Sequence, residues 1–123
     1  MNKGAYGMVK CINFFDLQVT PLLNGLITQT IVKWSDDTKD LSKGAILNIC
    51  FEGELFSNYK LQIKNIKRTG IAQLSNQDII KNGFLYKPHF ISFYQGKGIS
   101  KEDTILKIDF VLVEGVNEGN TKN

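Results

Sequence analysis

The stretch that decides the fold is FSNYKLQIKNIKR, residues 56–68. From Tyr59 to Lys64 apolar and polar side chains alternate, which is the period-two pattern of a β-strand with one buried face and one exposed face. The exposed face is basic, because no acidic residue occurs between residues 56 and 77. Residues 105–114 alternate in the same way, so two long half-buried strands predict a sheet that covers a hydrophobic core.

Shorter elements surround these two strands. Apolar or β-branched runs predict further strands at residues 8–15, 26–34 and 45–51. Short helices are expected at residues 16–24, ended by Gly25, at 75–83, and at 87–94. In the second helix Ser75 can cap the first turn with Asp78 three residues later, and Pro88 suits the first turn of the third.

The order of these elements favours an α+β fold. Helices are inserted between strands without regular alternation, so we expect a small mixed β-barrel of about five strands with two or three short helices. Closure of the sheet is favoured because it leaves no unpaired strand edges. The predicted domain spans residues 8–114, with a flexible N-terminus at residues 1–7 and a disordered tail at residues 115–123.

Length and composition limit the functions that are possible. A chain of 123 residues predicts one domain, and no apolar run approaches the roughly 20 residues that cross a bilayer. Because no export signal is visible, we expect a soluble cytoplasmic protein without membrane association. The net charge of +3 permits a polyanionic partner. Sequence-specific reading of duplex DNA is not expected, because 14 lysines accompany a single arginine, Arg68, and arginine is the side chain that contacts guanine bidentately.

The sequence contains no pattern that is typical of a metal or cofactor site. Cys11 and Cys50 lie 39 positions apart, and His89 is the sole histidine. These spacings predict neither a zinc site nor a disulfide framework, so both cysteines are expected to be reduced and buried. No cofactor is predicted.

Several short sequence motifs, taken in order, carry a family resemblance. They are INFF (residues 12–15), LLNG (22–25), TQTI (28–31), LSKGAIL (41–47), LSNQD (74–78), NGF (82–84) and FISFY (90–94). Their order and spacing resemble the ASCH domain, a branch of the PUA-like superfamily of small β-barrels that handle RNA and modified nucleosides. The resemblance covers most of the predicted domain and implies a PUA-like barrel.

The signature of that family, G-x-K-x-x-E-x-R, is degraded in this chain. When the first glycine of the signature is aligned with Gly25, its lysine, glutamate and arginine fall at Ile27, Thr30 and Val32. The bacterial acetylcytidine amidohydrolases of the family, which this chain resembles, also carry threonine at the position of Thr30. The resemblance implies that a lysine and a glutamate activate that threonine, and those two positions are here Ile27 and Asn82. A hydroxyl without a neighbouring base is a poor nucleophile at neutral pH, so the chain leans toward a non-catalytic domain.

The expected function is therefore binding of RNA or of a modified nucleoside or nucleotide in a cleft beside the second strand. The predicted ligand-binding residues are Thr28, Thr30, Lys33, Trp34, Lys60 and Lys64. Trp34 either stacks on a base or packs against the edge of the core. The lysines of residues 56–68 either follow a phosphate backbone or protect a strand edge from aggregation.

Two alternatives remain open. The first is an amidohydrolase that acts on acylated nucleosides such as acetylcytidine, with Thr30 as the catalytic nucleophile. The second is a protein-interaction accessory domain in which the apolar side chains of residues 90–94 form part of a partner surface.

Overall fold

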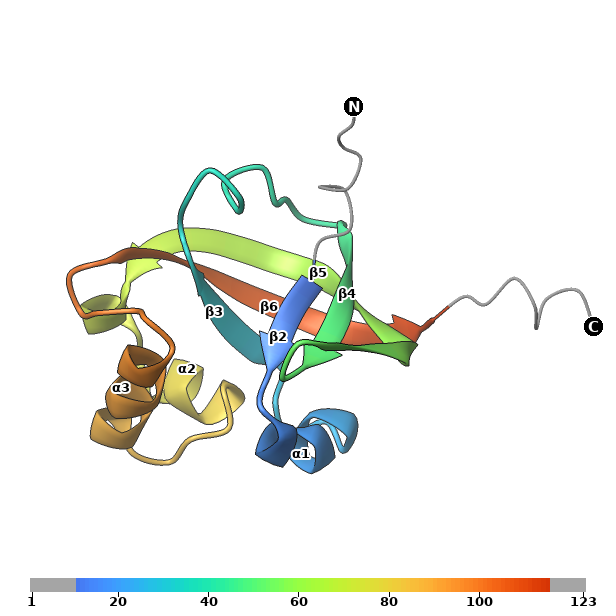
Figure 1. Ribbon diagram of the computed structural model, residues 1–123. Helices are drawn as coiled ribbons and strands as arrows, with labels where there is room; N and C mark the ends of the chain where they lie inside the picture. Colours follow the sequence, from blue (N-terminus) through green and yellow to red (C-terminus); the bar gives the residue numbers. More distant parts are fainter. Residues whose placement is uncertain (1–10, 116–123) are drawn as a thin grey trace, which may run out of the picture.

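The computed structural model describes residues 11–115 and forms one curled sheet with short helices at its side and end (Figure 1). The strands are β2 (Cys11–Phe14), β3 (Gln29–Lys33), β4 (Ile46–Phe51), β5 (Glu54–Gly70) and β6 (Thr104–Glu114). The helices are η2 (Asp16–Gln18), α1 (Val19–Leu23), η3 (Ile71–Gln73), α2 (Asn76–Lys81) and α3 (Lys87–Gly96). The predicted N-terminus 1–7, the first residues of the predicted strand 8–15, and residues 116–123 of the predicted tail 115–123 lie outside the described residues.

The sheet has the order β2-β4-β5-β6-β3, with β2 parallel to β4 and every other pair antiparallel. This confirms the predicted mixed five-stranded fold. The sheet curls into a half-barrel in which β2 and β3 are the two edges. β5 is longer than the predicted strand at both ends. It continues to Gly70 because that residue pairs with Thr104, the first residue of β6.

Two hydrophobic clusters stabilise the fold from opposite faces of the sheet. Inside the curl, side chains of all five strands pack with Leu22 of α1. On the outer face, Ile31 of β3 and Ile105 of β6 pack against α2 and α3. Phe90 and Tyr94 belong to this second cluster and are 0% and 1% exposed. The prediction that residues 90–94 form a partner surface is therefore wrong for these two, since α3 turns them toward the sheet.

α3 also links the two edges that a complete barrel would join. The Tyr94 hydroxyl lies 3.5 Å from the Thr30 hydroxyl on β3. One turn later, the Lys97 ammonium donates a hydrogen bond of 3.1 Å to the carbonyl of Asn13 on β2. The ammonium also lies 5.2 Å from the ring centre of Phe15 and 5.4 Å from that of Tyr94, at cation–π distance. The half-barrel is thus closed by side chains of a helix in place of a strand pair.

The predicted cap of α2 is confirmed. The Ser75 hydroxyl accepts a hydrogen bond from the backbone N–H of Asp78 at 3.1 Å, and the Asp78 carboxylate accepts one from the N–H of Ser75 at 2.9 Å. This reciprocal capping box satisfies two backbone donors that would otherwise lack partners. It fixes the start of α2 against the sheet.

Both cysteines are free thiols, and Cys50 is buried as predicted. The prediction of burial is wrong for Cys11, because β2 is an edge strand and Cys11 is exposed at its start. Across residues 11–115, no three His, Cys, Asp or Glu side chains gather as a metal site would require. The described helices are all too short or too polar to cross a membrane.

Candidate functional site

Thr30, the predicted centre of the site, is sealed inside the fold. Its side chain is 3% exposed, and among the described residues its hydroxyl has one side-chain partner, Tyr94. Burial raises the pKa of that tyrosine, which accordingly keeps its proton at neutral pH. A hydroxyl held against a neutral phenol has no general base beside it.

A buried polar network lies next to Thr30 and holds α2 on the sheet. The Gln29 amide nitrogen donates to the carboxylates of Asp78 at 3.1 Å and of Asp109 at 2.8 Å. Its amide oxygen accepts a bond of 2.7 Å from Asn82. The Lys107 ammonium lies 3.3 Å from the Asp78 carboxylate. Every member is thus satisfied within the protein, which is the pattern of a structural anchor.

Asp78 is the most strongly perturbed member of that network. Burial raises the pKa of its carboxyl, but hydrogen bonds from Ser75, Gln29 and Lys107 act in the opposite direction and hold it at about 2. Sequence patterns assigned Asp78 only to the helix cap and Lys107 and Asp109 only to a strand face. The polar Gln29 within a β-branched run was the one signal that could have revealed the network.

The structure brings Asn82 close to Thr30, although the two are far apart in sequence. The Tyr94 hydroxyl lies 3.5 Å from both the Thr30 hydroxyl and the Asn82 amide oxygen. Ile27, at the position where the resemblance asks for lysine, is buried in the core inside the curl. An amide and an alkyl side chain supply no proton acceptor of the strength of a carboxylate or an amine.

Thr28 opens on a surface groove of about 400 Å³. Its backbone is fixed on both sides: the N–H donates to the carbonyl of Lys81 at 2.8 Å, and the carbonyl accepts from the N–H of Phe110 at 3.0 Å. Gly25, with φ of +78°, ends α1 and turns the chain toward β3, so that residues 22–28 form one wall of the groove and residues 110–112 of β6 another. The groove is lined by Leu22, Leu23, Asn24, Gly25, Ile27, Thr28, Tyr59, Phe110, Val111 and Leu112, none of which is charged.

Lys33 and Trp34 lie at the opposite end of β3. The Lys33 ammonium is 3.7 Å from the Asp103 carboxylate in an exposed ion pair. Trp34 is 39% exposed, and the Arg68 guanidinium stacks over its ring at 4.8 Å. A second groove, of about 440 Å³, runs beside Arg68 and includes Lys101, Glu102 and Asp103.

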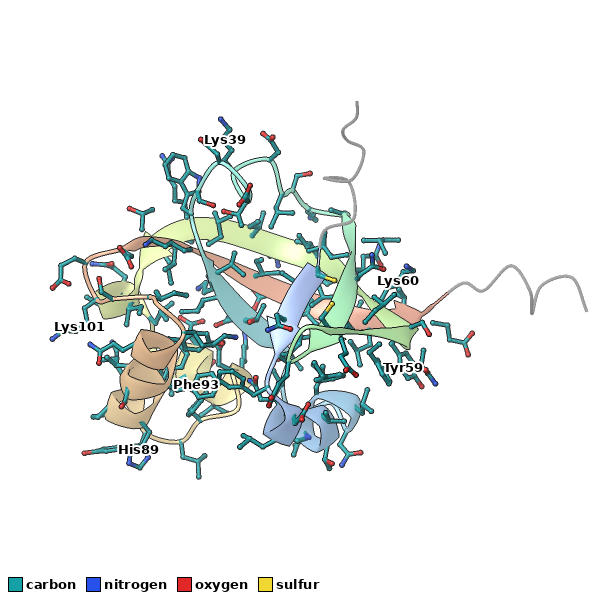
Figure 2. The ribbon with its side chains drawn as sticks, viewed as in Figure 1. Lys39, Tyr59, Lys60, His89, Phe93 and Lys101 are labelled. Carbon is teal, nitrogen blue, oxygen red and sulfur yellow. The ribbon has the colours of Figure 1, made fainter. Side chains whose placement is uncertain are left out.

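Lys60 and Lys64 lie on β5, away from Thr30. Lys60 donates a hydrogen bond of 2.6 Å to the Asn48 amide oxygen, and Lys64 is exposed at a register shift. The register places Ile66 of β5 level with Thr30, two strands away, and Lys60 lies six residues further along. Lys60 and Thr30 are therefore separated by roughly 20 Å. The predicted ligand-binding residues do not line one cleft. Thr28 and Thr30 lie at the start of β3, Lys33 and Trp34 at its end, and Lys60 and Lys64 on β5, where Figure 2 labels Lys60.

Comparisons with known proteins identify the fold. No protein-family model and no curated protein sequence matches the chain. The crystal structure of hypothetical protein PH0355 superposes with a TM-score of 0.64 and 14% identity, covering 84% of this chain and 97% of that one.

Two further crystal structures share the architecture. Protein EF3133 from Enterococcus faecalis V583, described with family model DUF984, gives a TM-score of 0.61 and 11% identity over 80% of this chain and 71% of its own. An ASCH domain from Lactobacillus crispatus JV V101 gives 0.57 and 12% identity over 85% and 80%. At these identities the likeness establishes the fold alone, and the fold is ASCH-like.

Proposed function

We propose that this chain is a non-catalytic ASCH-like domain that binds a nucleoside or nucleotide, free or within RNA, in the groove at Thr28. The observation that carries the proposal is the contrast between two hydroxyls at the start of β3, one just before the strand and one within it. Thr28 is exposed at an open groove, whereas Thr30 is buried and bonded to Tyr94. A ligand can therefore contact the first hydroxyl but not the second.

The lining of the groove suits a base or a nucleoside. Its volume of about 400 Å³ is in the usual range for small-ligand sites, roughly 300–1,000 Å³. Tyr59, which is 37% exposed, offers an aromatic face, and base stacking on such a ring contributes about 1–3 kcal/mol. Thr28 and Asn24 offer donors and acceptors for a base edge. The absence of charged lining residues favours the neutral base over the phosphate as the group that enters.

Hydrolysis through Thr30 receives no comparable support. Its hydroxyl would have to leave the Tyr94 contact, reach solvent and find a proton acceptor. The position at which the resemblance asks for a glutamate holds Asn82, whose amide is already bonded to Gln29. Thr30 therefore fits a packing role at the edge of β3 better than a nucleophilic one.

Titration with nucleosides, followed by backbone amide NMR, tests the proposal. Cytidine, acetylcytidine and adenosine should shift the resonances of Thr28 and its groove neighbours. Tyr59→Ala should weaken binding by about 5-fold to 150-fold, which corresponds to the stacking energy above. Tyr86→Ala is the matched control, because Tyr86 is 57% exposed and precedes α3, outside the groove. No shift with any nucleoside at millimolar concentration would overturn the proposal.

The non-catalytic part has its own test. Acetylcytidine incubated with the protein should remain unchanged, as judged by chromatography of the nucleoside. Release of cytidine by the wild type, abolished in Thr30→Val, would restore the hydrolase alternative.

A further inference from the structure

The second half of β5 has a neighbouring strand on one side only. β5 spans 17 residues, whereas β4 spans six. The last backbone bonds on the β4 side are those of Ile63, which donates to Ala45 at 2.9 Å and accepts from Gly44 at 2.8 Å. From Asn65 to Gly70, β5 pairs only with β6 within the described residues, and Figure 1 shows these two strands running on together beyond β4. This stretch is therefore a free strand edge.

The backbone groups that this edge presents follow from the hydrogen bonds of β6. The bonds of Thr104 and Phe110 run to the β3 side. Bonding directions alternate along an antiparallel strand, so residues 105, 107 and 109 bond to β5. The register places these three opposite residues 69, 67 and 65. The N–H and C=O of Ile66 and Arg68 therefore point to the free edge, and no hydrogen bond from residues 11–115 reaches them there.

Cations flank the free edge on both faces of the sheet. Ile66 packs against the core inside the curl, so Lys67 points outward and Arg68 inward, where its guanidinium lies over Trp34. Lys64 is exposed at the register shift that precedes them. The ion pairs within residues 11–115 include none of these three cations, and no acidic residue occurs between residues 56 and 77. The edge is therefore complementary to a partner that carries carboxylates on both of its faces.

The chemistry of the edge distinguishes its possible occupants. A second copy of the chain would bring Lys67 and Arg68 beside the same two cations, and like charges across a strand pair are destabilising. The phosphate groups of a nucleic acid are acceptors only, so they cannot bond the two carbonyls of the edge. An extended peptide supplies both N–H and C=O at every second residue, which is the spacing of Ile66 and Arg68.

We propose that the edge of β5 at residues 65–69 binds an extended acidic segment of a partner protein, which adds a strand to the sheet. The backbone of the segment pairs with Ile66 and Arg68, and its carboxylates lie beside the flanking cations. Five residues of a strand span about 17 Å, so about five residues of the partner are engaged. The edge is separate from the Thr28 groove, so the inference goes beyond the proposed function and stands independently of it.

Amide hydrogen exchange followed by NMR tests the free edge. In the protein alone, the amides of Ile66 and Arg68 should exchange at least about tenfold faster than those of Lys67 and Thr69, which bond to β6. A saturating acidic peptide should slow the first two amides about tenfold. Equal protection of all four amides in the protein alone would overturn the inference.

A pair of peptides with equal charge separates strand pairing from simple attraction. The probe is a blocked peptide of about seven residues in which glutamates lie on both faces of the extended chain around a central valine. The control has the same sequence but is N-methylated at its central residues, which removes backbone donors and keeps the charge. Loss of two hydrogen bonds should weaken the control about 30-fold. Equal affinities would show that the surface binds charge alone and would overturn the strand.

Two substitutions at one position make the same separation on the protein. Arg68→Gln removes the charge and keeps the N–H, so it should weaken binding of the probe by about 2-fold to 5-fold. Arg68→Pro also removes the N–H and should weaken binding at least about tenfold. Lys39→Gln, in the loop before β4, is the charge control and should have no effect. Equal effects of the two Arg68 variants would contradict strand pairing, and the N-methylated peptide decides the question if Arg68→Pro does not fold.

Other occupants of the edge give different results. No amide shift at residues 64–69 with the probe at millimolar concentration would overturn the inference. Single-stranded RNA of equal charge that shifts these amides at lower concentration than the probe would also overturn it. Dimerisation that protects the amides of Ile66 and Arg68 would assign the edge to a second copy of the chain. Cytidine binding at Thr28 should be unaffected by either Arg68 variant, so the proposed function is tested separately.

Discussion

Replacement of Asp78 by asparagine tests whether the buried network stabilises the fold through charge. The folded-state pKa of Asp78 is about 2, against an ordinary value of 3.8. One pKa unit is worth about 1.4 kcal/mol, so the ionised form contributes about 2 kcal/mol at pH 7. Because the pKa is lowered in the folded state, this stability is fully present above pH 5 and is lost as the pH falls toward 2. Linkage leaves about half of this contribution at pH 3 and only a small part of it at pH 2.

Asparagine approximates the protonated carboxyl, so the Asp78→Asn variant should lack only this contribution. Urea unfolding at pH 7, 3 and 2 measures the free energy of unfolding of both proteins. The difference between wild type and variant should decrease with pH as given above. Other carboxylates titrate in both proteins and cancel. Asp36→Asn, at an exposed carboxylate, is the control and should change the free energy of unfolding by less than about 0.5 kcal/mol at any pH. A difference for Asp78→Asn that is the same at pH 7 and pH 2 would refute the electrostatic reasoning.

Three further substitutions probe the closure of the half-barrel. Tyr94→Phe removes the hydroxyl that contacts Thr30 and should lower the free energy of unfolding by about 1 kcal/mol in urea titrations; no loss would mean that the 3.5 Å contacts contribute nothing. Lys97→Met keeps much of the chain length but removes the ammonium from its three rings, so a loss of about 1 kcal/mol should appear in thermal melts at pH 7; an unchanged melting temperature would mean that these cation–π contacts contribute nothing. Gly83→Ala combines a φ of +92° with a contact of 3.0 Å to Ile27 and should cost about 1–3 kcal/mol; a neutral result would refute the strain.

Local patterns predicted the elements because each depends on residues that are close in sequence. The alternation from Tyr59 to Lys64 is sufficient to place β5, and Ser75 with Asp78 is sufficient to start α2. The end of β5 was missed because Gly70 is held by its partner Thr104, which no local pattern of β5 reveals.

The candidate site was harder to predict because its contacts join distant segments. Gln29 and Asp78 are 49 positions apart, and Arg68 meets Trp34 across the sheet. Alternation indicates which face of a strand a side chain occupies, but it does not reveal what covers that face. Thr30 was therefore expected at a wet cleft, whereas Tyr94 of α3 covers it.

The way the half-barrel is closed explains why the open sites lie where they do. The two edge strands of the sheet do not pair with each other, so other groups must cover them. Here Tyr94 contacts the Thr30 hydroxyl on β3, and Lys97 donates a hydrogen bond to the Asn13 carbonyl on β2. The same closure that stabilises the fold removes the central hydroxyl from any ligand. Along β3, the exposed hydroxyl of Thr28 lies just before the strand and the exposed ring of Trp34 just after it. The groove at Thr28 and the exposed ring of Trp34 therefore flank the sealed hydroxyl of Thr30, which is why the proposed site lies at an end of β3.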